Sequence, residues 1–123
     1  SMSSTKNEEQ ELAIVGGQSK IRGSFQGGNF LIVEGEFAGS IQCQELVITR
    51  RGKIEAWVEV ENMEVWGEVN GFSRVKKVIC RKTSRIGGCI MGGGIALEPG
   101  VVIEGALAFE KAEDVENEGK ESS

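Results

Sequence analysis

The sequence predicts an all-β fold, a single-domain parallel β-helix (solenoid) of about six coils. Three observations lead to this prediction. A short apolar phrase returns at a nearly constant spacing, and glycine-containing pairs that favour turns fall between these phrases. No segment carries the three- and four-residue apolar spacing of an amphipathic helix. The chain has 123 residues, which suits one domain.

The repeated phrase consists of an apolar residue, any residue, a small residue, any residue and a second apolar residue. The small residues stand at positions 23, 39, 56, 71, 88 and 105, so the steps between them are 16, 17, 15, 17 and 17 residues. A period of this length is typical of a stacked-repeat architecture. The phrases are Ile21–Phe25, Phe37–Ile41, Ile54–Val58, Val69–Ser73 (with a polar end), Ile86–Ile90 and Ile103–Leu107.

Each phrase has the two-residue period of a strand with one buried face. Because alternate residues of a strand face the same side, Phe37, Gly39 and Ile41 are expected to point together into the core. Ala56 takes the place that Gly holds in the other phrases. We therefore interpret the small residue as a response to crowding between converging apolar side chains, rather than as a need for positive φ.

Short apolar runs between the phrases predict the remaining strands, and glycine pairs mark the turns. The runs are Phe30–Val33, Leu46–Ile48, Met63–Trp66, Val75, Val78–Cys80 and Ile95–Leu97, and the pairs are Glu34-Gly35, Arg51-Gly52, Trp66-Gly67 and Pro99-Gly100. Six coils about 4.8 Å apart would form a rod of roughly 29 Å.

Charge divides the chain into a nearly neutral domain at residues 12–109 and two acidic tails. Residues 1–11 contain one Lys and three Glu, and residues 110–123 contain two Lys and six acidic residues. Segments with so little apolar content cannot bury a core, so both tails are predicted to be disordered.

The three cysteines, Cys43, Cys80 and Cys89, cannot all pair within one chain, and their spacing matches no zinc-binding pattern. We expect reduced thiols and a cytoplasmic location. Cys89 occupies an outward position of its strand and is expected to be the most reactive thiol. Cys43 and Cys80 are expected to fill small apolar positions.

The two ends of the predicted rod are the candidate functional surfaces. The core begins at Leu12–Val15 and stops at Leu107–Phe109, and no amphipathic helix follows to cap either end. Uncapped coils can continue the stack from one molecule into the next. The candidate polymer-interface residues are Leu12, Ile14, Ile21, Phe25, Ile103, Leu107 and Phe109.

The series of phrases resembles the bactofilins, polymer-forming cytoskeletal proteins of bacteria. The likeness lies in Gly35–Ile41 and in Ile21–Phe25 followed by Phe30–Gly35, and it extends over residues 12–109. It implies a right-handed β-helix whose ends join into nonpolar filaments without a nucleotide. It also implies a role in cell shape or cell-wall organisation, with cell-wall enzymes or membrane-associated proteins as partners at the inner face of the cell membrane.

Three stretches depart from the family pattern. Residues 1–11 hold no apolar cluster apart from Met2, which argues against direct membrane attachment. Gly71 is followed by Phe72-Ser73-Arg74, so the fourth coil is expected to be bulged or looped. Gly92–Gly94 predicts an unusually flexible stretch.

Composition argues against catalysis and against a cofactor or metal. The chain contains no His and no Tyr, and no Cys, Asp or Glu cluster has the spacing of metal ligands. Gly87–Gly94 lacks both a following helix and a Gly-Lys-Ser/Thr sequence, so we interpret it as a turn between coils and not as a phosphate-binding loop.

The alternative function is an adaptor rod that does not polymerise and binds an anionic partner or membrane through a basic face at 74–85. Lys77, Arg81 and Arg85 would then lie along one outer face. Trp57 is a candidate partner contact at an outward position. Nucleic acid is not expected, because exposed aromatic residues and a basic charge balance are lacking. The candidate residues of the basic face are Arg74, Lys76, Lys77, Arg81, Lys82 and Arg85.

Overall fold

The computed structural model describes residues 11–111, whose regular structure consists of ten β-strands and no helix. This confirms the all-β prediction. The strands are β1 (Leu12–Val15), β2 (Lys20–Gln26), β3 (Phe30–Val33), β4 (Glu36–Ile48), β5 (Lys53–Val65), β6 (Glu68–Cys80), β7 (Arg85–Ile86), β8 (Cys89–Leu97), β9 (Val102–Ile103) and β10 (Ala106–Phe109).

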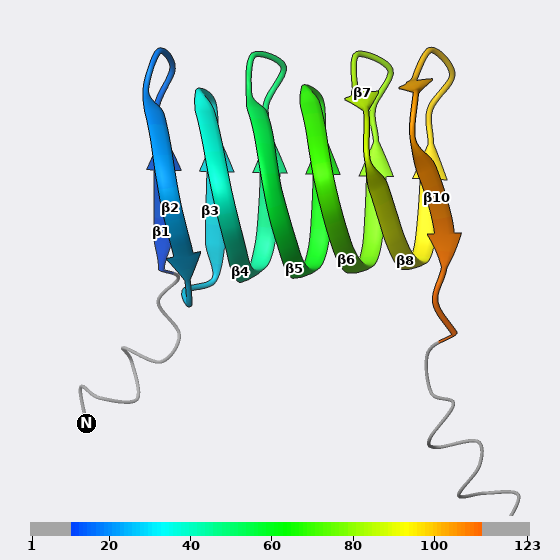
Figure 1. Cartoon of the computed structure of the whole chain (residues 1–123), viewed down its shortest axis with the longest axis horizontal. Coiled ribbons are helices and arrows are strands. Elements are labelled where there is room, and N and C mark those ends of the chain that lie inside the picture. Colours follow the sequence, from blue (N-terminus) through cyan, green and yellow to red (C-terminus); the bar gives the residue numbers. More distant parts are fainter. Residues whose placement is uncertain (1–10, 112–123) are drawn as a thin grey trace, which may run out of the picture.

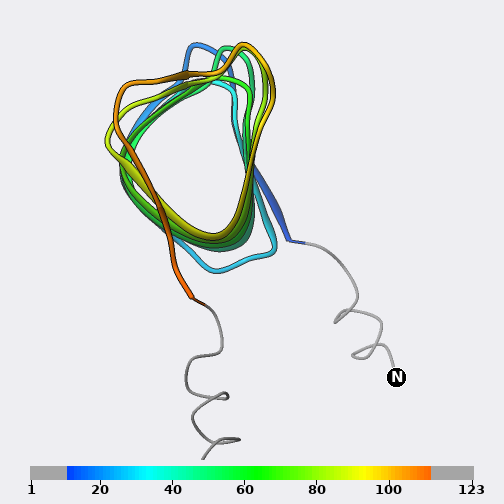
Figure 2. The same cartoon turned by 90° about the vertical axis from the view of Figure 1, so that its right-hand side faces the viewer.

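The strands wind into a solenoid in which each coil pairs in parallel with the next (Figure 1). Gly23 pairs with Gly39, Gly39 with Ala56, and Ala56 with Gly71, so the sequence period sets the register as predicted. Figure 2 looks along the rod from its C-terminal end. The chain runs counter-clockwise there as it advances towards the viewer, which makes the solenoid right-handed.

Three walls surround the core, and each wall collects one segment from every coil. Wall 1 contains β1, β3 and the second halves of β4, β5, β6 and β8, and it lies at the back in Figure 1. Wall 2 contains the segments that begin at Lys20, Glu36, Lys53, Glu68, Arg85 and Val102. Wall 3 contains the segments that begin at Ser24, Ser40, Trp57, Phe72, Cys89 and Ala106, and it faces the viewer in Figure 1.

Inward side chains from all three walls form one continuous apolar core. On wall 1, Val33, Ile48 and Val65 are stacked in register and fully buried. On wall 3, Ile41 and Val58 are stacked in the same way. Alternating residues point outward, so each wall has a buried face and an outer face.

The small residue of each phrase lies at the corner between walls 2 and 3, and its role differs from the one predicted. A Cβ on Gly39 would overlap the carbonyl oxygen of Gly23 one coil earlier, and a Cβ on Gly88 would overlap that of Gly71. Gly39 has a φ of 134° and Gly88 a φ of 74°. The constraint therefore comes from a neighbouring backbone and a left-handed conformation, and the interpretation as side-chain crowding without positive φ was wrong.

The expected bulge in the fourth coil is also wrong. β6 pairs residue for residue with β5 through Gly71, Phe72 and Ser73. Phe72 points outward, while Ser73 takes the inward position between Val58 and Ile90. The expected flexible glycine stretch lies inside the regular strand β8.

The predicted tails, 1–11 and 110–123, lie outside the described residues except for Glu11, Glu110 and Lys111. The backbone of Glu11 bonds to Asn29 and Phe30, and the backbone N–H of Glu110 donates to the carbonyl oxygen of Gly92.

Replacing Gly39 with Val should lower the free energy of unfolding by about 2–4 kcal/mol, because backbone strain adds to overpacking. Replacing the neighbouring Ser40, which points outward, should change it by less than about 0.5 kcal/mol. Urea unfolding followed by circular dichroism measures both variants. Equal stability of Gly39→Val and Ser40→Val would contradict the corner constraint.

Replacing Ser73 with Ala should raise the free energy of unfolding by about 1 kcal/mol, because the buried Ser73 hydroxyl has no hydrogen-bond partner. Ser84 is the matched control, since its buried hydroxyl donates to the carbonyl oxygen of Arg81 at 2.7 Å. Ser84→Ala should therefore destabilise in the same urea experiment. A loss of stability in Ser73→Ala would show that its hydroxyl is satisfied.

Candidate assembly surfaces

Both ends of the rod leave strand edges open. At one end β1 pairs only with β3 and β2 only with β4, and at the other β9 pairs only with β7 and β10 only with β8 (Figure 1). The outer edges of these strands have no partner strand among residues 11–111. An open edge is a row of backbone donors and acceptors that another strand can satisfy.

At the N-terminal end, the predicted interface residues divide into two groups. Ile21 is 44% exposed and Phe25 is half-buried, and both occupy inward positions in register with Phe37 and Ile41. They therefore lie at the open end of the core. Leu12 and Ile14 do not.

Leu12 and Ile14 alternate along β1 with Ala13 and Val15, which pack against the core. Leu12 and Ile14 are 58% and 55% exposed and point outward from wall 1. The structure thus places these two predicted interface residues on the side of the rod rather than in the core at its end.

At the C-terminal end, Ile103 and Leu107 are half-buried inward residues of the last coil, and Phe109 is 78% exposed. The structure brings these three predicted residues together at one end. Leu97 belongs with them, because it follows Cys80 in the same inward column and is 45% exposed. The sequence signal for Leu97 was its place one period after the buried Cys80.

The six predicted basic residues do not form one face. Arg74 lies on wall 3, Lys77 begins the wall 1 part of β6, Arg81 lies in the turn after β6 and Arg85 lies in β7 on wall 2. The expected alignment of Lys77, Arg81 and Arg85 was wrong, because the chain turns between β6 and β7.

Four of these cations bind carboxylates of their own chain. Arg74 pairs with Glu110, Lys76 with Glu61 at 3.3 Å, and Arg85 with Glu104 at 3.4 Å. The guanidinium of Arg81 pairs with carboxylates on two coils and is described next. Such pairing leaves less net positive charge for an anionic partner than the composition of 74–85 suggests.

Arg81 links three successive coils. Its guanidinium donates to Glu64 and to Glu98, each at 2.9 Å, and its carbon centre lies 5.2 Å from the ring centroid of Trp66. The hydrogen bond from Arg81 holds the pKa of Glu98 below its usual range. The hydrogen bonds from Arg74 act in the same direction on the pKa of Glu110. The ion pairs of Glu98 and Glu110 therefore stabilise the fold fully at a pH above the pKa of these carboxyl groups in the unfolded chain. This stabilisation is lost as the pH falls through their lower pKa in the folded protein.

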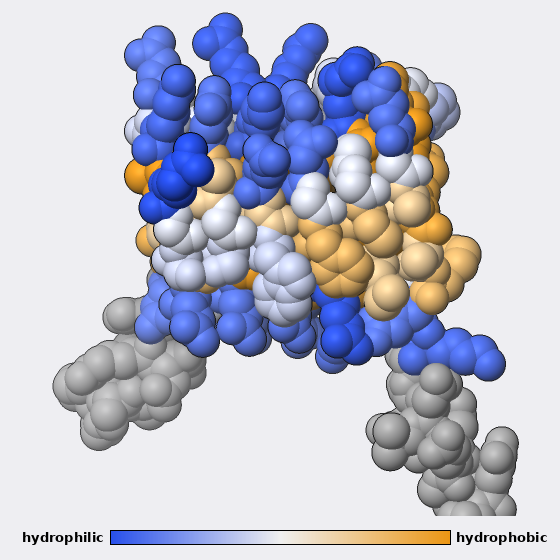
Figure 3. Space-filling view, viewed as in Figure 1, coloured by the Kyte–Doolittle hydropathy of each residue, from blue (hydrophilic) through white to orange (hydrophobic). Residues whose placement is uncertain are grey.

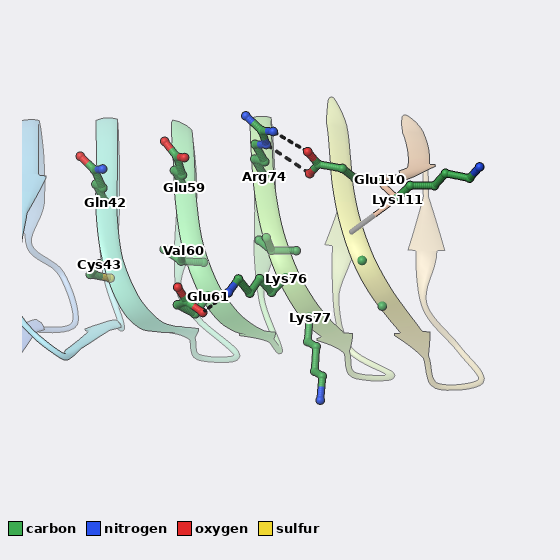
Figure 4. A pocket seen from close by; sticks show the side chains of 13 residues that line it. Gln42, Cys43, Glu59, Val60, Glu61, Arg74, Lys76, Lys77, Glu110 and Lys111 are labelled. Atoms are coloured by element: carbon green, nitrogen blue, oxygen red, sulfur yellow. Dashed lines mark hydrogen bonds and ion pairs between the residues drawn. The ribbon is translucent and has the colours of Figure 1, made fainter. Parts of the chain in front are cut away.

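A groove of about 940 Å³ follows the corner between walls 3 and 1 (Figure 4). Its lining mixes acids and bases, including Glu59, Glu61, Arg74 and Lys76, and the side chain of Lys77 points away from it. No group of His, Cys, Asp and Glu able to hold a metal occurs among the described residues.

The outer face of wall 3 changes character along the rod (Figure 3). One outward column begins with two polar residues, Ser24 and Ser40. Larger, less polar residues follow in register, namely Trp57, Phe72 and Cys89. Trp57 is 49% exposed, which confirms its predicted outward position. Its role as a partner contact stays a prediction.

The chain matches the family model described as "Bactofilin: Polymer-forming cytoskeletal" over residues 13–108. Comparison with curated proteins gave no match, and comparison with solved structures gave none. Within residues 11–111, no helix is long and apolar enough to cross a membrane.

Brief alkylation at pH 8 should modify Cys89 well before the other thiols. Burial raises the pKa of Cys80 to about 11, and burial together with the charge of Glu45 raises that of Cys43 to about 11. Such thiols are ionised to only about one part in a thousand at pH 8. Mass spectrometry of peptides measures the order of labelling. Equally fast labelling of Cys80 in the folded protein would contradict this prediction.

Proposed function

Because the chain belongs to the bactofilin family, described as polymer-forming and cytoskeletal, we propose that it is a self-assembling scaffold whose rods join end to end into filaments. The open strand edges at both ends are the observation that carries this proposal. A joint would supply the missing partner strand, with hydrogen bonds like those already made between coils.

Apolar residues at the ends support the same proposal. Ile21 and Phe25 at one end, and Leu97, Leu107 and Phe109 at the other, extend the inward columns to the open surfaces. Burying a Phe side chain at a joint would contribute about 1.5–3 kcal/mol. Because every joint repeats the contact, a small loss per joint shortens the polymer strongly.

The finer features of the proposal are nonpolar filaments, independence from nucleotide, and a cytoplasmic location at or near the inner face of the membrane. A role in cell shape or in positioning cell-wall enzymes belongs to the proposal as well. Support for nucleotide independence comes from the glycine-rich segment, whose residues 92–94 lie in β8 and are followed by no helix up to residue 111, the last one described. We propose no catalytic activity, because the family is described as cytoskeletal.

Electron microscopy of the purified chain tests the proposal. Filaments are expected without added nucleotide, and their axial repeat should be a multiple of the coil spacing of about 4.8 Å. A folded chain that stays in discrete particles at every salt concentration would favour an adaptor that does not polymerise.

Phe109→Arg should give monomers or short oligomers with an unchanged β-spectrum, because the charge would have to be desolvated at an apolar joint. Sedimentation velocity and electron microscopy measure the loss of filaments. Ser40→Arg on the outer face of wall 3 is the matched control and should still polymerise. Long filaments from Phe109→Arg would show that the C-terminal end is not a joint.

A further inference from the structure

The outer face of wall 1 is unusually apolar for a surface exposed to water. Two outward columns run along it, one on each side of the inward column that contains Leu31 and Leu46. Leu12, Ile14 and Ile79 are exposed, and most of the others are half-buried. In coil order, the first column contains Leu12, Phe30, Glu45, Asn62, Lys77 and Gly94. The second column contains Ile14, Ile32, Val47, Glu64, Ile79 and Ala96.

Wall 2 shows what a water-facing wall of this chain looks like. One of its outward columns alternates in charge from coil to coil. Its first five members are Lys20, Glu36, Lys53, Glu68 and Arg85, and the uncharged Val102 ends it. Wall 1 has no such ladder, so its apolar surface is not a general property of the solenoid.

Two charges on wall 1 stand in one column, two coils apart. Glu45 belongs to the third coil and Lys77 to the fifth, with Asn62 between them. Lys77 has no ion-pair partner among residues 11–111, and its side chain points outward in Figure 4. Among residues 11–111, the side-chain carboxylate of Glu45 accepts a hydrogen bond only from the neutral amide of Asn62, at 2.9 Å. Each charge therefore lacks an opposite charge within its own rod.

We propose that wall 1 binds the same wall of a second copy, with the two rods antiparallel and a two-fold axis along strand segment 62–65. This axis preserves each column and reverses the coil order. Glu45 of each rod then faces Lys77 of the other, which pairs both charges in one symmetric contact.

The same axis also matches side-chain sizes. Phe30 comes to lie opposite Gly94, and Ile32 opposite Ala96, so each large residue meets a small one. Val47 lies opposite Ile79. Leu12 and Ile14 overhang by one coil and reach the next subunit along a filament. Glu64 faces its own copy, and its charge is already balanced by Arg81 at 2.9 Å.

The area of wall 1 that one rod can bury against another indicates whether single rods or whole filaments pair stably. The five coils that overlap in one pair, with four wall residues in each, give a contact of about 24 by 13 Å, or about 310 Å² per rod. Stable protein pairs bury about 800 Å² on each side. Single rods therefore pair weakly, whereas subunits already joined in a filament pair many times over. Lateral pairing of filaments thus rests on the proposed end-to-end assembly. Weak pairing of single rods does not depend on it.

Other occupants fit less well. Residues 1–10 contain Met2 as their one apolar side chain, so their composition offers little apolar surface to match this wall. An anionic membrane would leave the Glu45 carboxylate without an opposite charge and facing negative headgroups. A second copy satisfies the charges and the apolar surface together.

Charge reversal tests the geometry in filaments. Lys77→Glu alone and Glu45→Lys alone should each convert paired filaments into single ones, because like charges then face each other. The double variant should restore pairing. Arg51→Glu and Glu55→Lys make the same changes at exposed positions away from wall 1, and should leave the pairs intact. Filament width by electron microscopy is the measurement, with circular dichroism as the check on folding.

Cross-linking tests the pair without filaments. In a Phe109→Arg background with Cys43 and Cys89 replaced by Ser, Asn62→Cys places a thiol on the proposed axis. A short bis-maleimide should then give dimers at high protein concentration. The dimer yield should fall at least tenfold with Lys77→Glu and recover when Glu45→Lys is added. Glu55→Cys on wall 2, in the same background, should give no dimer above background.

The outcomes separate the two proposals. Cross-linked dimers with this charge dependence, from a chain that never forms filaments, would overturn the end-to-end scaffold and keep the pairing. Single-width wild-type filaments, together with no cross-linked dimer from the Asn62→Cys variant, would overturn the pairing and keep the scaffold. Dimers or bundles that ignore both charge reversals would also overturn the proposed axis.

Discussion

Parallel pairing of each coil on the coil before it is the constraint on which this structure depends. The backbones approach so closely at the corner between walls 2 and 3 that a Cβ on Gly39, Gly88 or Gly105 would overlap a carbonyl oxygen one coil earlier. The position tolerates Gly or, once, Ala56. Because this contact recurs at Gly39, Gly71, Gly88 and Gly105, it fixes the register of all three walls at once. The phase of the apolar columns, and therefore the continuity of the core, follows from it.

The same constraint makes the ends of the rod unlike its walls. An inner coil is hydrogen-bonded on both sides, whereas β1, β2, β9 and β10 are bonded on one side only among the described residues. The inward columns also end there with Ile21 and Leu107 partly uncovered. Within residues 11–111 the end strands are uncovered, and the surface that would complete them has the geometry of one more coil, which supports the end-to-end assembly that we propose.

Much of this fold could be predicted from the sequence, because a period of 15 to 17 residues determines which residues pair between neighbouring coils. The predictions that failed depended on three-dimensional details within the period. Leu12–Val15 is apolar at every position, so periodicity could not say which residues face inward, and the structure puts Ala13 and Val15 there. Lys77, Arg81 and Arg85 looked like one stripe because the turn between β6 and β7 has no glycine or proline to mark it. Positive φ at Gly39 could not be predicted from the sequence. Ala56 occupies the equivalent position in the next coil, and a residue with a Cβ rarely adopts positive φ.

The outer faces of walls 1 and 2 differ in composition, and we assign them different roles from those of the rod ends. The alternating charges of wall 2 favour the native register, because a shift by one coil would set Lys against Lys and Glu against Glu along the whole column. Wall 1 has no such device, and the exposed surface of its outward apolar residues adds to stability only when something covers it. Its acid and base lie two coils apart in one column, so each rod carries both halves of a symmetric contact. The end contacts that we propose act along the rod axis, and the wall 1 contacts that we propose act across it. A chain with both can lengthen and thicken by separate sets of residues, and a substitution in one set need not disturb the other.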